Sequence, residues 1–214
     1  FNQDESAIGY NAYSILQTGK DEYGKSFPLY FKSFGDQKLP IYIYLTAASE
    51  KVFGINEFAV RFPSALLGSL TVVMLIFLLQ TLGVSTLLAF TTGLFLALNP
   101  WHLFFSRAAF EDNIALSFAV FGTWLFFIAL KKKKILYLFI SVIGFTMSVY
   151  SYNVTRLLSP VLLLGLIFLN WKILKEFPKR SLLAVGCFFI FLLAPFFITF
   201  LSPEGALSAH GALI

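Results

Sequence analysis

The sequence predicts an all-α fold, a polytopic bundle of transmembrane helices with shorter helices on one membrane surface. Of the 214 residues, 58% are hydrophobic, 13% are charged and 27 are phenylalanine, a composition outside the range of ordinary soluble domains. The apolar residues gather into windows of about 17 to 22 residues, the length of helix that crosses about 30 Å of hydrocarbon. The charged residues fall between these windows. Together these observations indicate a multi-pass membrane protein.

Residues 1–62 precede the first window and are expected to form a loop on the outer face that contains juxtamembrane helices and an acidic motif. Between residues 5 and 16 the apolar residues recur near helical spacing, and Gly19 then supplies a stop signal. A first surface helix is therefore predicted, followed by a loop rich in Gly, Asp and Lys.

A second surface helix is predicted to begin at Pro40 and to end at Gly54. Proline suits the first turn of a helix, where its missing N–H costs no hydrogen bond, and glycine suits the position after the last turn. Tyr42 and Tyr44 in this run are typical of residues at the lipid headgroups.

The transmembrane bundle is expected to occupy residues 63–214, with Pro63 in the first turn of its first helix. The predicted spans are 63–82, 86–105, 114–130, 135–151, 157–171 and 181–201. The chain starts at Phe1 without a signal peptide, and it stops shortly after the last span. We therefore expect it to be a fragment of a longer protein with a further span before Phe1.

Charge predicts the orientation of the bundle. Short loops after the third and fifth spans are rich in Lys and Arg, which accumulate in short cytoplasmic loops. These loops contain only one acidic residue, Glu176. The outer face is then expected to hold residues 1–62, the loops 106–113 and 152–156 and the C-terminal tail, and with them the other ten acidic residues. The basic excess reflects this anchoring in the plasma or inner membrane. The pattern does not favour nucleic acid as a partner.

Two acidic pairs are predicted to share the outer face. Asp4-Glu5 alone is better explained as an N-cap followed by an acidic first turn, which stabilises a helix. Glu111-Asp112 returns to the same face between two spans, however, and ionisable groups at a membrane boundary tend to be functional. The two pairs together indicate chemistry at the membrane surface.

Several segments resemble a known family. The runs DESAIGYNAYSILQTGKDEYGKSFPLYF, GDQKLPIYIYL, VFGINEFAVRFPSALLGSLTV and NPWHLFFSRAAFEDN are similar, in this order and spacing, to bacterial glycosyltransferases of the dolichyl-phosphate-mannose protein mannosyltransferase type. These belong to the membrane-embedded GT-C class, which includes the lipid A aminoarabinose transferases. The resemblance covers about residues 1–130 well, and the later spans only in hydrophobic character.

The resemblance implies a GT-C helical bundle and a transfer reaction at the extracytoplasmic face. Such enzymes move a sugar from a polyprenyl-phosphate carrier to an acceptor hydroxyl on protein, lipid or polysaccharide, usually with inversion at the anomeric carbon. A carboxylate must accept the proton of the attacking hydroxyl. By resemblance Asp4 is that base, and Glu5 orients it or the acceptor.

The departing phosphate needs positive charge. The outer face offers four candidates: Lys38, Arg61, Arg107 and Arg156. Lys38 resembles the lysine-proline element of the aminoarabinose transferases, although Leu39 separates it from the proline here. Arg61 sits at a span boundary, where snorkelling to headgroups is the simpler explanation.

Two further features remain open between a structural and a functional explanation. Arg107 and Glu111-Asp112 are explained equally well by a local salt bridge and by a role in binding the donor phosphate. Tyr152 and Arg156 are placed to line a sugar cleft, against the simpler explanation of interface residues.

No cofactor is predicted with certainty. Family members differ in their use of divalent metal, and Glu111 and Asp112 are the residues that would bind one. The expected partners are the bilayer, a lipid-linked sugar donor and an acceptor that the sequence does not identify. A secondary transporter and a non-catalytic subunit of cell-envelope polysaccharide assembly are the alternatives to an enzyme.

Overall fold

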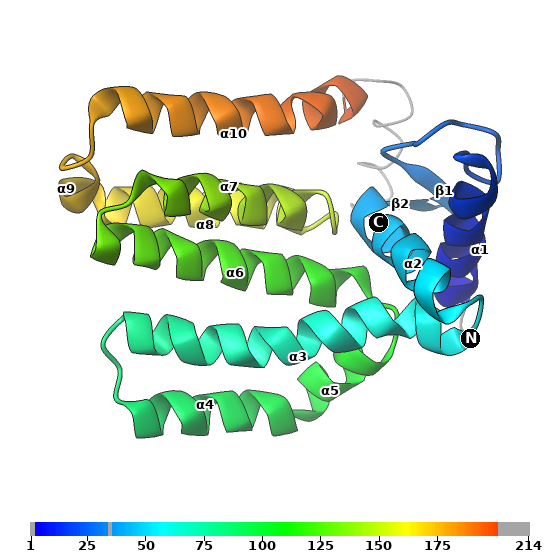
Figure 1. The fold of residues 1–214 in the computed structure, drawn as a ribbon, viewed down its shortest axis with the longest axis horizontal. Helices are drawn as coiled ribbons and strands as arrows, with labels where there is room; N and C mark the ends of the chain where they lie inside the picture. Colours follow the sequence, from blue (N-terminus) through cyan, green and yellow to red (C-terminus); the bar gives the residue numbers. More distant parts are fainter. Residues whose placement is uncertain (1–2, 34–35, 201–214) are drawn as a thin grey trace.

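The computed structural model describes residues 3–33 and 36–200. Within these residues the chain forms ten helices and one two-stranded antiparallel hairpin, so the all-α prediction is confirmed. Figure 1 shows two parts: a bundle of long helices lying roughly side by side, and a smaller group of elements across one end of that bundle. The end of the sixth predicted span at 201 and the tail 202–214 lie outside the described residues.

The end group contains the first four elements of the chain. They are α1 (Gln3–Thr18), β1 (Phe31–Ser33), β2 (Asp36–Lys38) and α2 (Pro40–Phe53). Both predicted surface helices are present. Gly19 (φ 68°) and Gly54 (φ 78°) follow α1 and α2 in the left-handed backbone region, which glycine adopts without steric cost.

The bundle contains the remaining helices. They are α3 (Glu57–Thr81), α4 (Thr86–Leu98), α5 (Pro100–Arg107), α6 (Glu111–Lys132), α7 (Ile135–Val149), α8 (Thr155–Leu169), α9 (Trp171–Leu174) and α10 (Lys179–Phe200). By length and apolar composition, α3, α6 and α10 are each able to cross a membrane, whereas α7 and α8 are shorter apolar helices. The predicted spans thus fall largely on helices.

The second predicted span, 86–105, is not one straight helix. It divides at Asn99 into α4 and α5, which meet at an angle of 60°. Pro100 cannot donate the backbone hydrogen bond that would continue α4, and the Asn99 side chain instead accepts from the N–H groups of Trp101 and His102. The Asn-Pro pair therefore ends one helix and caps the next.

A buried apolar cluster attaches the end group to the bundle. Ile8 of α1, Tyr42 and Ile43 of α2, Val60 of α3 and Ile114 of α6 are all nearly inaccessible to solvent and pack together. This cluster fixes α1 and α2 against the start of two bundle helices. Side chains on α1 are thereby held in defined positions over one end of the bundle.

The lysine-rich segments lie at the other end of the bundle. Figure 1 places the α6–α7 connection and α9 at the end opposite α1 and α2. There Lys133 pairs with Glu176 at 2.6 Å. One end of the bundle therefore carries the lysine-rich segments, and the other carries α1 and α2 with the acidic pair Asp4-Glu5.

This difference gives a test of sidedness. In a Cys187→Ser background, we expect a membrane-impermeant maleimide to label Asp36→Cys in intact cells. We expect it to label Lys133→Cys only after the membrane is opened, because Lys-rich short loops remain in the cytoplasm. Labelling of position 133 but not of position 36 in intact cells would reverse the orientation.

Candidate functional site

Asp4 and Lys38 are brought together at the free surface of the end group. Asp4 lies in the first turn of α1, so it is within the helix rather than immediately before it as an N-cap. Lys38, the last residue of β2, places its Nζ 3.1 Å from Asp4 Oδ1. The Asp4 side chain is 53% exposed and that of Lys38 is 13% exposed. The carboxylate is therefore accessible, and the cation beside it is largely enclosed.

Glu5 has a different environment from its neighbour Asp4. It is only 2% exposed, and Arg61 binds both of its oxygens, with Nε 2.7 Å from Oε1 and Nη2 2.9 Å from Oε2. The backbone N–H of Ala109 also donates to Oε1 at 3.2 Å. Glu5 thus joins α1 to α3 and to the connection between α5 and α6.

Arg61 is held within the protein rather than among headgroups. Besides its two bonds to Glu5, its Nη1 lies 3.5 Å from Glu57 Oε2, one helical turn earlier on α3. The guanidinium is planar and matches a carboxylate with two parallel hydrogen bonds. Arg61 thus has two carboxylate partners within the protein, which the snorkelling explanation does not require.

Tyr42 is a buried residue at the centre of the site. The prediction that it faces headgroups is wrong, because it is 0% exposed and its hydroxyl donates to the Val60 carbonyl at 3.1 Å. Burial raises the pKa of Tyr42 well above its ordinary value; a hydrogen bond with Ser64 lowers it in part, and the charges of Glu5 and Glu111 raise it further. One carboxylate from each acidic pair therefore acts on the same phenol.

Tyr44, the second tyrosine predicted at the headgroups, is half-buried. Its hydroxyl donates to the Pro28 carbonyl at 2.9 Å, and its ring meets Phe31 edge to face. Burial raises the pKa of Tyr44 to about 12, and the charge of Asp21 adds to this. Tyr44 stabilises the loop before β1 against α2.

The second acidic pair is divided between two environments. The charge of Glu111 acts on Tyr42, whereas Asp112 lines a cavity with His102 and Asn99 at the α4–α5 bend. Arg107 ends α5 with an exposed side chain, and no ion pair between described residues joins it to either acid. The predicted local salt bridge is therefore not seen in this part of the chain.

Arg156 lies where α8 meets the end group and α10. Its guanidinium lies over the ring of Tyr30 at 5.2 Å and over that of Phe196 at 5.4 Å from the ring centroids. Such stacking holds a cation through the electron-rich ring faces. Tyr152 lies half-buried in the turn before α8, with its carbonyl accepting from Thr155 Oγ1 at 2.8 Å.

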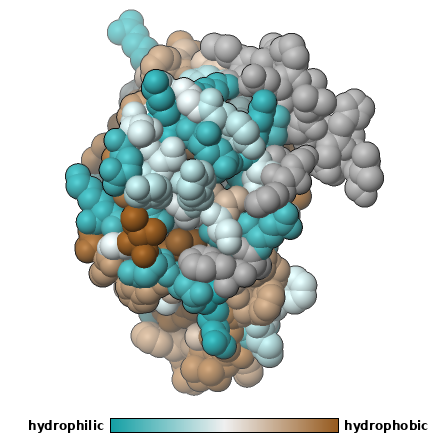
Figure 2. All heavy atoms as spheres, turned by 90° about the vertical axis from the view of Figure 1, so that its right-hand side faces the viewer, coloured by the Kyte–Doolittle hydropathy of each residue, from teal (hydrophilic) through white to brown (hydrophobic). Residues whose placement is uncertain are grey.

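The hairpin places Lys38 and Arg156 in one region. Lys38 is paired with Phe31 in the β1–β2 register, and the preceding residue, Tyr30, is the one that Arg156 stacks on. Two cations that are distant in the sequence are thus associated with adjacent residues, Phe31 and Tyr30. Figure 2, which looks onto this end, shows hydrophilic side chains spread over it.

Glu111 and Asp112 are the residues that the sequence offers for a divalent metal. The described residues contain no cluster of three or more His, Cys, Asp or Glu side chains that would hold an ion.

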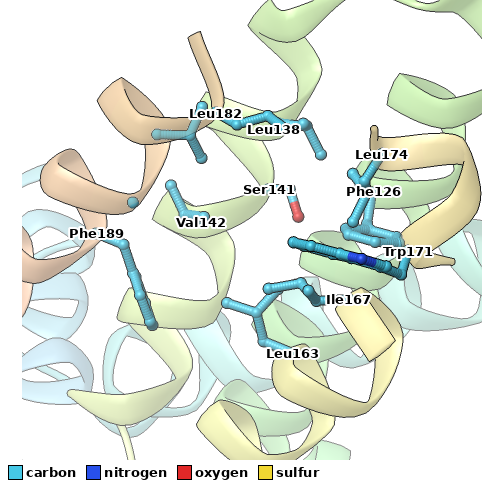
Figure 3. A pocket seen from close by; sticks show the side chains of 12 residues that line it. Phe126, Leu138, Ser141, Val142, Leu163, Ile167, Trp171, Leu174, Leu182 and Phe189 are labelled. Atoms are coloured by element: carbon cyan, nitrogen blue, oxygen red, sulfur yellow. The ribbon is translucent and has the colours of Figure 1, made fainter. Parts of the chain in front are cut away.

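A separate apolar cavity lies away from the acidic residues. Figure 3 shows it between α6, α7, α8 and α10, with a volume of about 220 Å³. Ser141 is its one hydroxyl-bearing residue, and that hydroxyl already donates to the Gly122 carbonyl at 2.7 Å. This cavity offers no titratable group for chemistry.

Glu50 is a residue of this end group that sequence reasoning missed. It lies in the last turn of α2, is 3% exposed, and lines a pocket that also contains Glu5. The signal was a single acid in the otherwise apolar and small-residue run IYIYLTAASE. Its burial depends on packing against α1, which the run itself does not reveal.

The chain is similar to one known family and one solved structure. The model of the family described as dolichyl-phosphate-mannose-protein mannosyltransferase matches residues 37–198. The crystal structure of ArnT from Cupriavidus metallidurans in the apo state matches with a TM-score of 0.63 and 15% identity over 94% of this chain. The matched part is 38% of the ArnT chain. Among curated proteins, none matches.

Proposed function

Because the chain belongs to the dolichyl-phosphate-mannose-protein mannosyltransferase family, we propose that it forms the catalytic membrane region of a glycosyltransferase. The donor is a sugar linked to a polyprenyl phosphate, and the acceptor is a hydroxyl group at the extracytoplasmic face. The ArnT-like fold and the three helices able to cross a membrane support a membrane enzyme of the GT-C class.

The observation that carries this proposal is the pair of Asp4 and Lys38. The exposed carboxylate of Asp4 is proposed to accept a proton, and the ammonium of Lys38, which pairs with it at 3.1 Å, to exchange this contact for one with a phosphate. Inverting transfer needs a base and a cation on the two sides of the anomeric carbon. Asp4 and Lys38 are in direct contact in this structure, so their ion pair must open for the sugar to lie between them.

The proposed step is a single displacement. The acceptor oxygen attacks the anomeric carbon and forms the new glycosidic bond, while the bond from that carbon to the phosphate oxygen breaks and its electrons leave with the lipid phosphate. The acceptor proton passes to Asp4 Oδ1 or Oδ2. Attack from the face opposite the phosphate inverts the anomeric centre.

Lys38 and Arg156 are proposed to stabilise the leaving phosphate. Lys38 pairs with Phe31 in the strand register and Arg156 stacks on Tyr30, so both cations are associated with the same short segment at the start of β1. Tyr152, in the turn before Arg156, is proposed to contact the sugar. Arg107 is exposed at the end of α5 and is assigned to the lipid phosphate only if the carrier extends along that helix.

The distribution of charge supports an enzyme over a transporter. In the described bundle helices, the charged side chains lie within about two turns of the helix ends, for example Arg61 in α3 and Lys131 in α6. A secondary transporter would place such groups at interrupted helices near the membrane centre. At the Asn99 bend, the charged residue lining the cavity is Asp112, which lies in the first turn of α6.

A direct assay tests the proposal. The full-length membrane protein would be incubated with a panel of lipid-linked sugars and candidate hydroxyl acceptors, and products would be detected by mass spectrometry. We expect release of free lipid phosphate together with a product heavier by one sugar residue. Failure of every polyprenyl-phosphate donor, with folded protein and intact membranes, would remove the assignment.

Lys38→Met is expected to raise KM for the lipid-linked donor about tenfold to a hundredfold, because a charge-assisted contact to the phosphate is lost. Steady-state kinetics with varied donor measure this. Lys32→Met is the matched control, since Lys32 lies in the neighbouring register pair, on the opposite face of the hairpin, with its ammonium over Tyr23. Unchanged KM in Lys38→Met would separate Lys38 from the donor.

A further inference from the structure

A pocket lies between α1, the end of α2 and the start of α3, and neither Asp4 nor Lys38 lines it. We name it the Glu50 pocket. Its volume is about 350 Å³. Its walls are formed by residues Glu5, Ser6, Gly9, Tyr10, Tyr13, Glu50, Ile55, Asn56 and Val60.

The carboxyl of Glu50 is buried against this pocket without a partner. The residue is 3% exposed, and neither Oε1 nor Oε2 has a hydrogen-bond partner among the described residues. Buried polar groups are almost always hydrogen-bonded, and an unpartnered one costs free energy. A carboxyl left in this state at a pocket wall is explained by a ligand that supplies the missing interaction.

Gly9 of α1 allows close packing beside the pocket. A Cβ atom at Gly9 would lie 3.0 Å from Val60 Cγ2, a tight contact, and 3.6 Å from Glu50 Oε1, an ordinary one. The absence of a side chain at Gly9 therefore lets α1 approach α3 closely. Burial raises the pKa of Glu50 to about 7, so the group is poised between its neutral and charged forms.

The pocket walls favour a cation. Two of the lining residues, Glu5 and Glu50, are acidic, and none of the lining residues is Lys, Arg or His. The nearby Arg61 is occupied by Glu5 and Glu57. A second carboxylate would be repelled here, whereas an ammonium would gain the charge of Glu50.

Aromatic rings at the pocket complete this chemistry. Tyr10 is 58% exposed and Tyr13 is 37% exposed, so both rings are available to a ligand. Ring faces attract ammonium groups, and the combination of carboxylate and aromatic ring is selective for them over neutral polar groups. A cavity of this volume accepts an alkylammonium group, which is larger than a simple metal ion.

The surroundings of the pocket place it near the membrane surface. Val52, Phe53, Ile55 and Phe58 are exposed apolar residues at the α2–α3 connection, where the first long apolar helix begins. Exposed aromatic and aliphatic side chains at such a position suit the headgroup region. An ammonium ligand therefore has two sources there, a lipid headgroup and a soluble amine.

We propose that the Glu50 pocket binds an alkylammonium group, held by the Glu50 carboxylate and the faces of Tyr10 and Tyr13. Asp4 and Lys38, which carry the proposed sugar transfer, do not line this pocket, whereas Glu5 does. Binding requires the ionised form of Glu50. The other titratable groups at the pocket are Glu5, Tyr10 and Tyr13 from α1, while Asn56, the N-cap of α3, is neutral.

The test uses ethanolamine as the probe and ethylene glycol as its neutral isostere, with the purified full-length protein in detergent at constant ionic strength. We expect saturable binding of ethanolamine, measured by calorimetry, and none of ethylene glycol. Affinity is expected to rise about tenfold between about pH 6 and pH 8, because Glu50 ionises over this range while the amine stays charged. Equal binding of both probes would overturn the ammonium assignment.

Variants identify the group responsible. Glu50→Gln is expected to weaken ethanolamine binding at least about tenfold and to remove its pH dependence. Glu176→Gln, at the opposite end of the bundle, is the matched control and is expected to bind like the parent. Unchanged binding in Glu50→Gln would overturn the proposal. If Glu50→Gln does not fold, two measurements replace it. Ethanolamine binding is measured in Tyr13→Leu, and the infrared band of the Glu50 carboxyl is recorded in the parent protein with and without ethanolamine. A carboxyl band that ethanolamine does not change contradicts the proposal.

The source of the ammonium is decided in bilayers. Nanodiscs containing phosphatidylglycerol alone would be compared with nanodiscs containing added phosphatidylethanolamine, and retained lipid would be read by native mass spectrometry. Selective retention of phosphatidylethanolamine that Glu50→Gln loses supports a headgroup ligand. Ethanolamine binding without lipid retention supports a soluble amine. Absence of both would overturn the site without bearing on sugar transfer.

Discussion

Asp4→Asn is expected to lower the rate of sugar transfer by about a hundredfold to ten-thousandfold, the contribution typical of a general base. Asparagine has nearly the same size and still accepts a hydrogen bond, but it cannot take the proton of the acceptor hydroxyl. The effect should appear in kcat more than in donor KM, because the donor phosphate meets Lys38 rather than Asp4. Initial rates with varied donor and acceptor measure both constants.

The same substitution should leave the fold intact. Asp4 is 53% exposed, and an ion pair with one exposed member contributes about 0 to 1 kcal/mol. Thermal unfolding and membrane insertion are therefore expected to match those of the parent. Glu176→Gln provides a control for removal of a carboxylate elsewhere. Normal turnover in Asp4→Asn would remove the base assignment.

The sequence predicts the elements of this fold better than it predicts their contacts. The two surface helices and most spans follow from apolar periodicity and from Gly19, Pro40 and Gly54, which act locally. The paired strands β1 and β2 fall in a segment that the sequence predicts as a loop, because each strand has three residues and shows too little alternation for a strand signal. The sequence predicts one straight span at 86–105 because apolar content alone does not register a break by proline.

In the candidate site, too, the sequence predicts the residue types better than it predicts their contacts. Asp4 and Glu5 are adjacent and chemically similar, yet one is half-exposed and the other is buried. Their difference depends on Arg61, which is distant in the sequence and reaches Glu5 only after α1 packs on α3. The burial of Tyr42 and Glu50 arises from the same packing, so periodicity within α2 could not distinguish them from residues facing lipid headgroups.

Arg61→Met is expected to be the most destabilising of the substitutions considered for the site. It removes both Arg61 hydrogen bonds from the Glu5 carboxylate, which is 2% exposed. Removal of one partner from a buried ion pair costs about 3 to 5 kcal/mol. The Arg61 side chain is itself 36% exposed, so we expect about 3 kcal/mol, the lower end of that range. Thermal or denaturant unfolding in detergent measures the loss.

The double variant Glu5→Gln/Arg61→Met separates a structural pair from a catalytic one. Glutamine fills the same space without a buried charge, so the double variant should be more stable than Arg61→Met alone. If Glu5 acts only by fixing α1, transfer per folded molecule should recover in part together with stability, since Asp4 returns to its position. If stability recovers while transfer stays at the level of Asp4→Asn, the ionised carboxylate of Glu5 is itself required. Glu5 would then take part in the reaction rather than only holding the helix that carries the base.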